Sequence, residues 1–137
     1  MPEMTDADAD AFLRDLHLGV LAVERSANPP LAVPIWYDVD DSGNVIVWTH
    51  GGSLKAKLVS RAGRASLTVQ RETVPYAYVS VEGHTTVAPA DDATARRIAR
   101  RYLGESGGDE FLDSNPTEGN VIITIHRDKV RSLTYDE

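Results

Sequence analysis

The segment 49–57, THGGSLKAK, combines two lysines, two hydroxyl side chains and a pair of glycines. Ser53 is a suitable N-cap for a helix that starts at the next residue, so free backbone N–H groups and the positive end of the helix dipole meet there. Thr49 and Ser53 add hydroxyl groups, while Lys55 and Lys57 add positive charge. This group of donors is suited to bind a phosphate or another small anion.

The charge distribution around this segment favours the same interpretation. The chain has 21 acidic residues and a net charge of -7, yet no Asp or Glu occurs from Ser42 to Arg71. A zone without negative charge lowers the cost of holding an anion. The spacing alone also fits an ordinary exposed amphipathic helix whose lysines contact only solvent.

Other chemistries find little support. The sequence contains no cysteine, and its four histidines have no metal-ligand spacing, so we expect no metal site. No nucleophile elbow, Walker loop or dinucleotide fingerprint occurs, and the catalytic group stays unidentified. Tyr76, Tyr78 and Trp36 are suited to line an apolar pocket above a ring, to pack in the core or to form a dimer interface.

The composition is that of a globular protein, and the length predicts one domain spanning residues 1–137. A net charge of -7 argues against nucleic-acid binding, which depends on Lys and Arg at phosphates. The sequence has no apolar run of the roughly 20 residues that cross a membrane, and its first residues lack signal-peptide features. We therefore expect a cytoplasmic protein that binds neither nucleic acid nor membranes.

The elements that would position the anion-binding segment are mostly strands. Alternating and β-branched residues predict strands at 19–24, 31–39, 45–50, 64–70, 76–88 and 121–133. Helices are predicted at 5–18, 54–61 and 93–103, with Gly104 closing the last, and a loop is predicted at 104–120. Gly83 predicts a bulge or bend within its strand. Six strands with few helices indicate a mainly β fold, a small antiparallel barrel with a filled interior and its ligand outside or at a subunit interface.

The strand order and several short motifs resemble a known family. The motifs are GVLAVE at 19–24, the stretch 29–49, Ser-x-Lys-x-Lys at 53–57, RAGRASLTVQ at 61–70 and YVSVEGHTTV at 78–87. Together they resemble the pyridoxamine 5'-phosphate oxidase-like split β-barrel family, most closely its actinobacterial branch of flavin- and deazaflavin-dependent oxidoreductases. The resemblance runs from about residue 10 to residue 133. It implies an FMN-binding split barrel of six antiparallel strands in a Greek-key-like order.

The resemblance also implies a homodimer with two cofactor sites at the subunit interface. Thr49, Ser53, Lys55 and Lys57 would hold the cofactor phosphate, and the other positions would lie along the ring. The predicted cofactor-binding residues are Pro34, Trp36, Val47, Trp48, Thr49, Ser53, Lys55, Lys57 and Tyr76. The substrate-binding arginine and histidine pair of true pyridoxamine phosphate oxidases has no counterpart, which argues against vitamin B6 oxidation. The turn at 60–64 also departs from the usual arginine–aspartate–proline.

FMN and the deazaflavin coenzyme F420 both carry a tricyclic ring, a ribityl chain and a phosphate, so one such site suits either. Arg61 and Arg64 could bind the anionic tail of coenzyme F420, or they could be exposed surface residues without a ligand. The leading hypothesis is a reductase that moves a hydride from reduced coenzyme F420 to an unsaturated small organic molecule. The alternatives are an FMN-binding oxidoreductase and a non-catalytic module that binds flavin, deazaflavin or heme.

Overall fold

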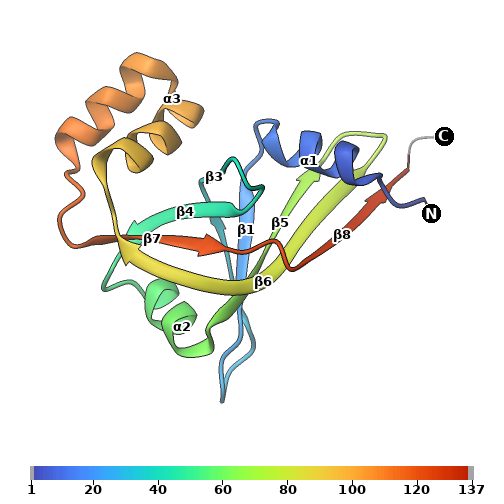
Figure 1. The fold of residues 1–137 in the computed structure, drawn as a ribbon, viewed down its shortest axis with the longest axis horizontal. Helices are drawn as coiled ribbons and strands as arrows, with labels where there is room; N and C mark the ends of the chain where they lie inside the picture. Colours follow the sequence, from blue (N-terminus) through green and yellow to red (C-terminus); the bar gives the residue numbers. More distant parts are fainter. Residues whose placement is uncertain (1, 136–137) are drawn as a thin grey trace.

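The computed structural model describes residues 2–135, which form three helices and eight strands (Figure 1). The helices are α1 (Asp6–Arg14), α2 (Leu54–Ala62) and α3 (Asp92–Ser114). The strands are β1 (Gly19–Val23), β2 (Leu31–Ile35), β3 (Tyr37–Val39), β4 (Val45–His50), β5 (Arg64–Arg71), β6 (Ala77–Pro89), β7 (Asn120–Ile125) and β8 (Lys129–Thr134). Within this part of the chain, no helix is long and apolar enough to cross a membrane.

The strands form one antiparallel sheet that curls on itself. Its order is β2-β1-β5-β6-β7-β4-β3, and β8 pairs with β6. β2 pairs with β1 and β3 pairs with β4, while Trp36 alone separates β2 from β3 along the chain. The sheet therefore curls into a half-barrel whose end strands, β2 and β3, follow one another along the chain but pair with different strands, and the connection from β4 through α2 to β5 joins non-adjacent strands in a Greek-key-like path. The predicted mainly β barrel is confirmed.

Two of the six predicted strands are interrupted. The predicted strand 31–39 breaks at Trp36 into β2 and β3, and the predicted strand 121–133 breaks after Ile125 into β7 and β8. The first break lets one continuous stretch of chain pair with two different neighbours, because β2 pairs with β1 and β3 pairs with β4. The second break does not change the neighbour, because β7 and β8 both pair with β6. The six predicted strands thus become eight.

The second break is a bulge opposite Gly83. The two pairs that flank it are Glu82 with Lys129 and Thr85 with Ile125, so two residues of β6 face three residues of the other strand. A Cβ added to Gly83 would lie 1.7 Å from a backbone carbonyl oxygen of that strand. Only glycine permits this approach, and the bend lies where the sequence predicts it.

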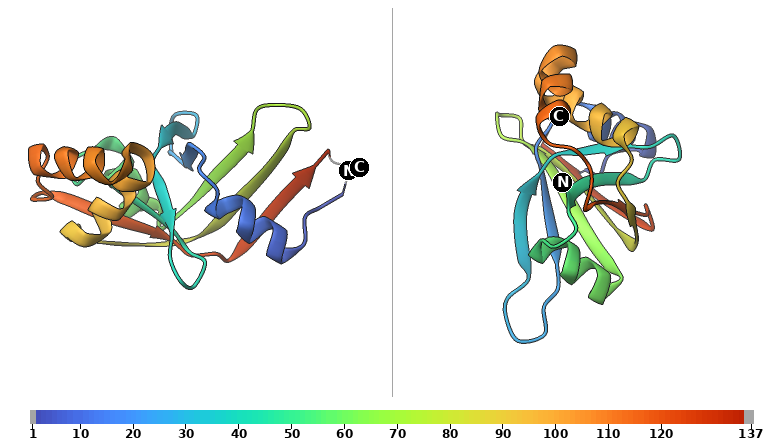
Figure 2. Two further views of the ribbon diagram at one scale, coloured as in Figure 1. Left: turned by 90° about the horizontal axis from the view of Figure 1, so that it is seen from above. Right: turned by 90° about the vertical axis from the view of Figure 1, so that its left-hand side faces the viewer.

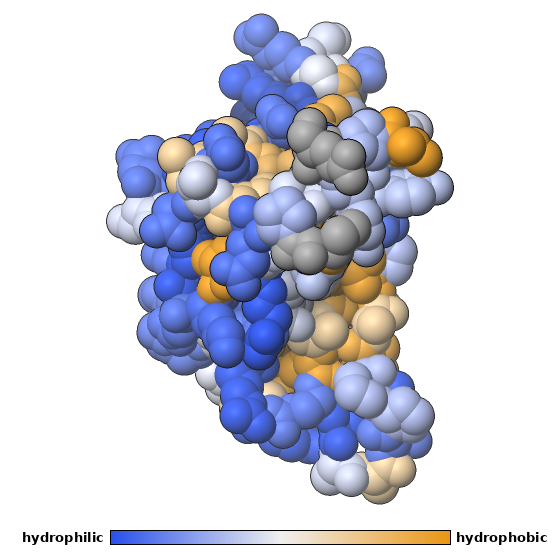
Figure 3. Space-filling view, turned by 90° about the vertical axis from the view of Figure 1, so that its right-hand side faces the viewer, coloured by the Kyte–Doolittle hydropathy of each residue, from blue (hydrophilic) through white to orange (hydrophobic). Residues whose placement is uncertain are grey.

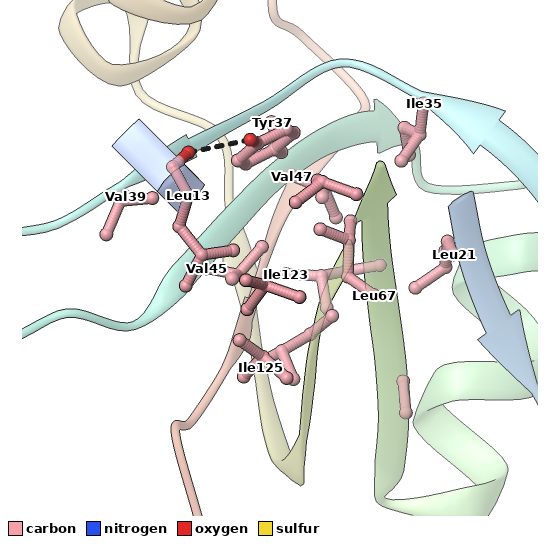
Figure 4. Close-up of a cluster of buried hydrophobic side chains, with 14 of the residues drawn as sticks. Leu13, Leu21, Ile35, Tyr37, Val39, Val45, Val47, Leu67, Ile123 and Ile125 are labelled. Atoms are coloured by element: carbon pink, nitrogen blue, oxygen red, sulfur yellow. Dashed lines mark hydrogen bonds between the residues drawn. The ribbon is translucent and has the colours of Figure 1, made fainter. Parts of the chain in front are cut away.

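Apolar side chains fill the barrel, as Figure 4 shows. The largest fully buried side chains include Tyr37, Leu13, Leu21, Leu67, Ile123 and Ile125. The Tyr37 hydroxyl donates a hydrogen bond of 2.7 Å to the Leu13 carbonyl and so ties α1 to the barrel. Burial raises the pKa of Tyr37, which keeps this hydroxyl a donor. A core filled in this way places a bound ligand on the outside of the barrel.

The helix ends follow the capping rules. Thr5 caps α1 by accepting a hydrogen bond from the Asp8 N–H, and Ser53 caps α2 by accepting one from the Ala56 N–H. Gly63 ends α2 in the left-handed conformation with a φ of 70°. These termini lie where the sequence predicts them, although α1 ends at Arg14 and not at residue 18.

The prediction of a loop over 104–120 is wrong for residues 105–114, which are helical. Gly104 has φ 80° and ψ 170°, and this non-helical joint divides α3 into a first segment, 92–103, and a second segment, 105–114. Figures 1 and 2 show α3 as two helical pieces packed over one end of the barrel, near β4 and β7. The second segment therefore covers the outside of the sheet.

Tertiary contacts explain why this glycine-rich stretch is helical. A Cβ on Gly108 would lie 2.6 Å from the Arg100 Cα, so the glycine allows the two segments to touch. Asp109 accepts hydrogen bonds of 3.0 Å from Arg96 and 2.9 Å from Arg100 across the joint. The side chain of Leu112 is buried in the contact with the first segment. Packing thus overrides the weak helix propensity of glycine.

Candidate functional site

The turn between β4 and α2 directs its polar groups toward the start of α2. The Gly51 N–H donates to the Gly119 carbonyl at 2.9 Å, and the Ser53 N–H donates to the His50 carbonyl at 3.0 Å. The Ser53 hydroxyl lies 3.4 Å from the Thr49 hydroxyl. The first N–H groups of α2, at positions 54 and 55, have no preceding carbonyl in the helix to bond, so they are available to an anion.

The charge at the start of α2 differs from that of the other two helices. α1 carries Asp6 and Asp8 in its first turn and α3 carries Asp92, whereas the first turn of α2 has no acidic residue. Acidic residues normally stabilise this end of a helix by interacting with its dipole. α2 instead places Lys55 there, which costs stability and supports the interpretation that an external anion takes the place of the missing carboxylate.

A pocket of about 410 Å³ lies beside this helix start, on the outside of the barrel. Four parts of the chain build it: the junction of β2 and β3, the end of β4, the first turn of α2, and the second segment of α3 with the residues that follow. Its lining residues are Pro34, Ile35, Trp36, Trp48, Thr49, His50, Lys55, Phe111, Asn115 and Asn120. Its volume lies within the usual range of ligand sites.

The structure gathers most of the predicted cofactor-binding residues at this pocket. The five that line it are Pro34, Trp36, Trp48, Thr49 and Lys55. Ser53 stands next to them as the cap of α2. The remaining three lie elsewhere: the Val47 side chain is fully buried in the barrel, Lys57 is exposed outside the lining, and the Tyr76 ring contacts Tyr135 near the β5–β6 turn.

Sequence reasoning missed the residues that α3 contributes. Phe111 lines the pocket from α3, where the sequence predicts a loop, and Asn115 lines it as the C-cap that follows, in a stretch that is non-helical as predicted. A signal for Phe111 does exist, because it and Leu112 are apolar residues within an otherwise polar stretch. Isolated apolar residues of that kind indicate a contact with the rest of the fold.

Aromatic rings form the apolar wall of the pocket. The Trp36 ring stacks on Tyr102 with centroids 5.2 Å apart, and the Phe111 ring lies 5.5 Å from Trp36 and 5.9 Å from Trp48. Burial raises the pKa of Tyr102, whose hydroxyl donates to the His17 carbonyl at 2.6 Å. The indole Nε1 of Trp48 is buried without a hydrogen-bond partner among residues 2–135. The wall suits a flat, largely apolar ring.

His50 adds a hydrogen-bond donor to the polar end of the pocket. Its Nδ1 accepts a hydrogen bond of 3.0 Å from the Gly52 N–H. An imidazole that accepts at Nδ1 is neutral and carries its proton on Nε2. In this tautomer the Nε2–H of His50 is suited to donate a hydrogen bond to a ligand beside Lys55.

A larger hollow of about 710 Å³ lies over β1, β5 and β6. Its arginine and its histidine are already paired within the chain, because Arg64 bonds to Glu24 and His84 bonds to Asp128 at 2.7 Å. Arg64 is therefore a weaker candidate for an anion contact than the sequence suggests. The pocket beside Lys55 is the better candidate for an anionic ligand.

The comparisons with known proteins agree with this fold. The chain is 34% identical over 124 residues to an F420H(2)-dependent biliverdin reductase of Mycobacterium tuberculosis, covering 90% of this chain and 84% of the relative. A conserved hypothetical protein of Mycobacterium tuberculosis has the same fold, with a TM-score of 0.77 and 23% identity over 96% of this chain and 85% of its own.

A candidate pyridoxamine 5'-phosphate oxidase of Listeria innocua also shares the fold, with a TM-score of 0.72 and 17% identity over 93% of this chain and 96% of its own. No protein-family model matches the chain. The family assignment therefore rests on the sequence relative, on the common fold and on the motifs between residues 19 and 87. The chain belongs to the pyridoxamine 5'-phosphate oxidase-like split β-barrel family, in its branch of flavin- and deazaflavin-dependent oxidoreductases.

Proposed function

We propose that the protein is a homodimeric reductase that binds reduced coenzyme F420 beside α2 and delivers its hydride to an unsaturated organic molecule. The observation that carries the proposal is the pocket that joins Lys55 at the start of an acid-free helix to two tryptophan rings. The F420H(2)-dependent biliverdin reductase relative supports the choice of coenzyme F420 over FMN. It also makes linear tetrapyrroles the first substrates to try.

The residues of the pocket fit such a cofactor by their chemistry. Lys55, the His50 Nε2–H and the N–H groups at the start of α2 would hold the phosphate, with Thr49 and Ser53 beside them. Trp36 and Pro34 would orient the ring. When bound, the reduced deazaflavin supplies the hydride.

The second segment of α3 forms an apolar side of the pocket. Phe111 packs against Trp36 and Trp48 there, and Asn115 lies at the end of the segment. Apolar surroundings strengthen the electrostatic contacts of Lys55 with the phosphate, because fewer water molecules screen them. The protein's part is then binding and orientation, while solvent, which reaches the open pocket, supplies the proton that completes the reduction.

The proposed dimer interface is the outer face of β2, β1, β5 and β6. Facing pairs across these strands place Pro34 beside Val20, Val20 beside Thr68 and Thr68 beside Ser80, a row without charge. Val20 is 39% exposed, and Figure 3 shows an apolar area over β1 and β2 above the hydrophilic β1–β2 loop. An apolar surface on a sheet is the usual sign of a protein contact. Tyr76 enters the proposed site only through such an assembly.

Val20→Asp is expected to convert the dimer to monomers, because it places a carboxylate at the centre of the uncharged row. The side chain points away from the core, so the unfolding temperature should change little. Sedimentation velocity measures the outcome. Leu103→Asp is the matched control, since Leu103 is 43% exposed on α3 away from this face. A wild-type protein that sediments as a monomer at micromolar concentration contradicts the proposed interface.

The reductase function is tested by supplying reduced coenzyme F420 together with an organic acceptor such as biliverdin. The expected result is oxidation of the cofactor that depends on the acceptor and consumes little oxygen, because reduced deazaflavins react poorly with oxygen. Cofactor absorbance and an oxygen electrode record both rates at once. Rapid oxygen consumption with bound FMN, and no turnover of the deazaflavin, would support the FMN alternative instead.

A further inference from the structure

The second segment of α3, residues 105–114, is held rigidly against the candidate pocket. Gly104 supplies the sharp joint, and Gly108 touches the Arg100 backbone. Asp109 receives hydrogen bonds from Arg96 and from two nitrogens of Arg100, at 2.9 to 3.0 Å. Arg96 lowers the pKa of the Asp109 carboxyl, so the pair stays charged. The segment therefore serves as a fixed wall of the pocket.

This wall presents an aromatic ring at a defined position. Phe111 lies 5.5 Å from the Trp36 ring at an interplanar angle of 55° and meets Trp48 edge-on at 90°. The Asn115 side chain donates a hydrogen bond of 3.0 Å to the Phe111 carbonyl, which fixes the end of the segment. A ring packed on two others in this way cannot rotate freely, so its size and shape limit what the pocket admits.

The walls of the pocket divide by chemistry. The sheet and α2 carry Lys55, His50 and Thr49, which are the groups suited to the anionic part of a cofactor. α3 contributes Phe111, and its C-cap Asn115 contributes a neutral amide, so neither group is charged. If the cofactor is anchored at Lys55, the α3 side of the pocket is free to contact the second ligand, the hydride acceptor.

We propose that Phe111 is the specificity-determining residue of this pocket and that it selects flat, conjugated acceptors, which stack against its ring. This inference rests on the proposed reductase function. A flat conjugated carbonyl compound gains an aromatic contact with Phe111, whereas a small puckered acceptor does not. Asp109 is a positioning residue for this contact, because it fixes the segment that carries the ring.

The experiment compares the wild type, Phe111→Ala, Phe111→Leu and Phe111→Tyr with two acceptors, the flat quinone menadione and the puckered ring cyclohexenone. For Phe111→Ala we expect the KM for menadione to rise about three- to tenfold, and the KM for cyclohexenone to change less than about twofold. Phe111→Leu should also lose the preference for menadione over cyclohexenone, while Phe111→Tyr, which keeps an aromatic ring, should retain it. Leu103→Ala, an exposed position on the first segment of α3, should behave like the wild type.

A second readout needs no turnover. The chain has two tryptophans, Trp36 and Trp48, and both line the pocket, so quenching of tryptophan fluorescence by menadione reports binding there. Phe111→Ala should need about three- to tenfold more menadione for half-maximal quenching. The inference would be overturned if Phe111→Ala raised the KM for both acceptors equally. It would also be overturned if the variant bound the cofactor more weakly while its affinity for menadione stayed unchanged. A wild type that binds menadione but neither cofactor would instead refute the proposed function and leave the role of Phe111 measurable.

Discussion

Lys55→Glu weakens cofactor binding by at least about a hundredfold if the phosphate sits at the start of α2. Replacing the lysine removes a charge-assisted contact worth about 1.5–3 kcal/mol, and the new carboxylate adds repulsion in a partly dehydrated pocket. Folding should not suffer, because a glutamate in the first turn of α2 interacts favourably with the helix dipole by about 0.3–1 kcal/mol. Affinity and stability should therefore change in opposite directions.

Lys57→Glu is the matched control for this variant. It makes the same charge change two residues further along α2, where the side chain is exposed and does not line the pocket. Positions two apart on a helix point about 200° away from each other. We expect the Lys57 variant to weaken binding by less than about fivefold, through screened long-range repulsion. Fluorescence titration gives the affinities for the cofactor, and thermal melts give the stabilities. Equal losses of affinity in both variants would show that the phosphate does not bind at Lys55.

Gly83→Ala is expected to destabilise the barrel by about 3 kcal/mol or more, the largest stability effect that we predict. The added Cβ would lie 1.7 Å from the His126 carbonyl oxygen and 2.8 Å from the His126 carbonyl carbon. These are backbone atoms of the bulge that joins β7 to β8, so no side-chain rotation relieves the clash. The strand must move away from β6, which breaks the hydrogen bond of 2.9 Å from the His126 N–H to the His84 carbonyl.

Urea denaturation followed by far-UV circular dichroism measures this loss. Gly107→Ala is the control, because Gly107 lies within the helical second segment of α3 and its nearest neighbour is the Leu103 side chain at 3.1 Å. Alanine favours a helix over glycine by about 1 kcal/mol, which offsets the tight contact, so this variant should stay within about 1 kcal/mol of the wild type. A Gly83 variant as stable as the wild type would show that the bulge is not needed.

The local features of this fold could be predicted from the sequence because single residues determine them. Thr5 and Ser53 cap their helices with their own side chains, and Gly63 ends α2 because it adopts a left-handed conformation. Gly83 marks the bend because no side chain fits there. The 3.6-residue helical period also separates the direction of Lys55 from that of Lys57.

The second segment of α3 could not be predicted, because its helix depends on contacts between distant residues. Gly107 and Gly108 suggest a loop, and each lowers helix propensity by about 1 kcal/mol. The compensation comes from Arg96 and Arg100 on the first segment and from the burial of Leu112. No local sequence pattern predicts that the two segments of α3 pack against each other.

The complete pocket was beyond sequence reasoning for the same reason. The family resemblance placed Trp36 and Trp48 near a cofactor ring, but the packing of these two rings under Phe111 requires that β2, β4 and α3 meet in space. His50 likewise becomes a directed donor only through its hydrogen bond to the Gly52 N–H. The sequence therefore predicts the types of residue that bind the phosphate and the ring, but not the side of the pocket that α3 forms.

We expect the pocket beside Lys55 to bind coenzyme F420 in preference to FMN. The most direct test titrates the wild-type protein with each cofactor separately while following tryptophan fluorescence, since both tryptophans line this pocket. We expect saturable quenching by both cofactors. Coenzyme F420 should bind at least about tenfold more tightly, because its additional negative charges are attracted to the acid-free region around α2. Tighter binding of FMN, or an absence of quenching by coenzyme F420, would contradict it.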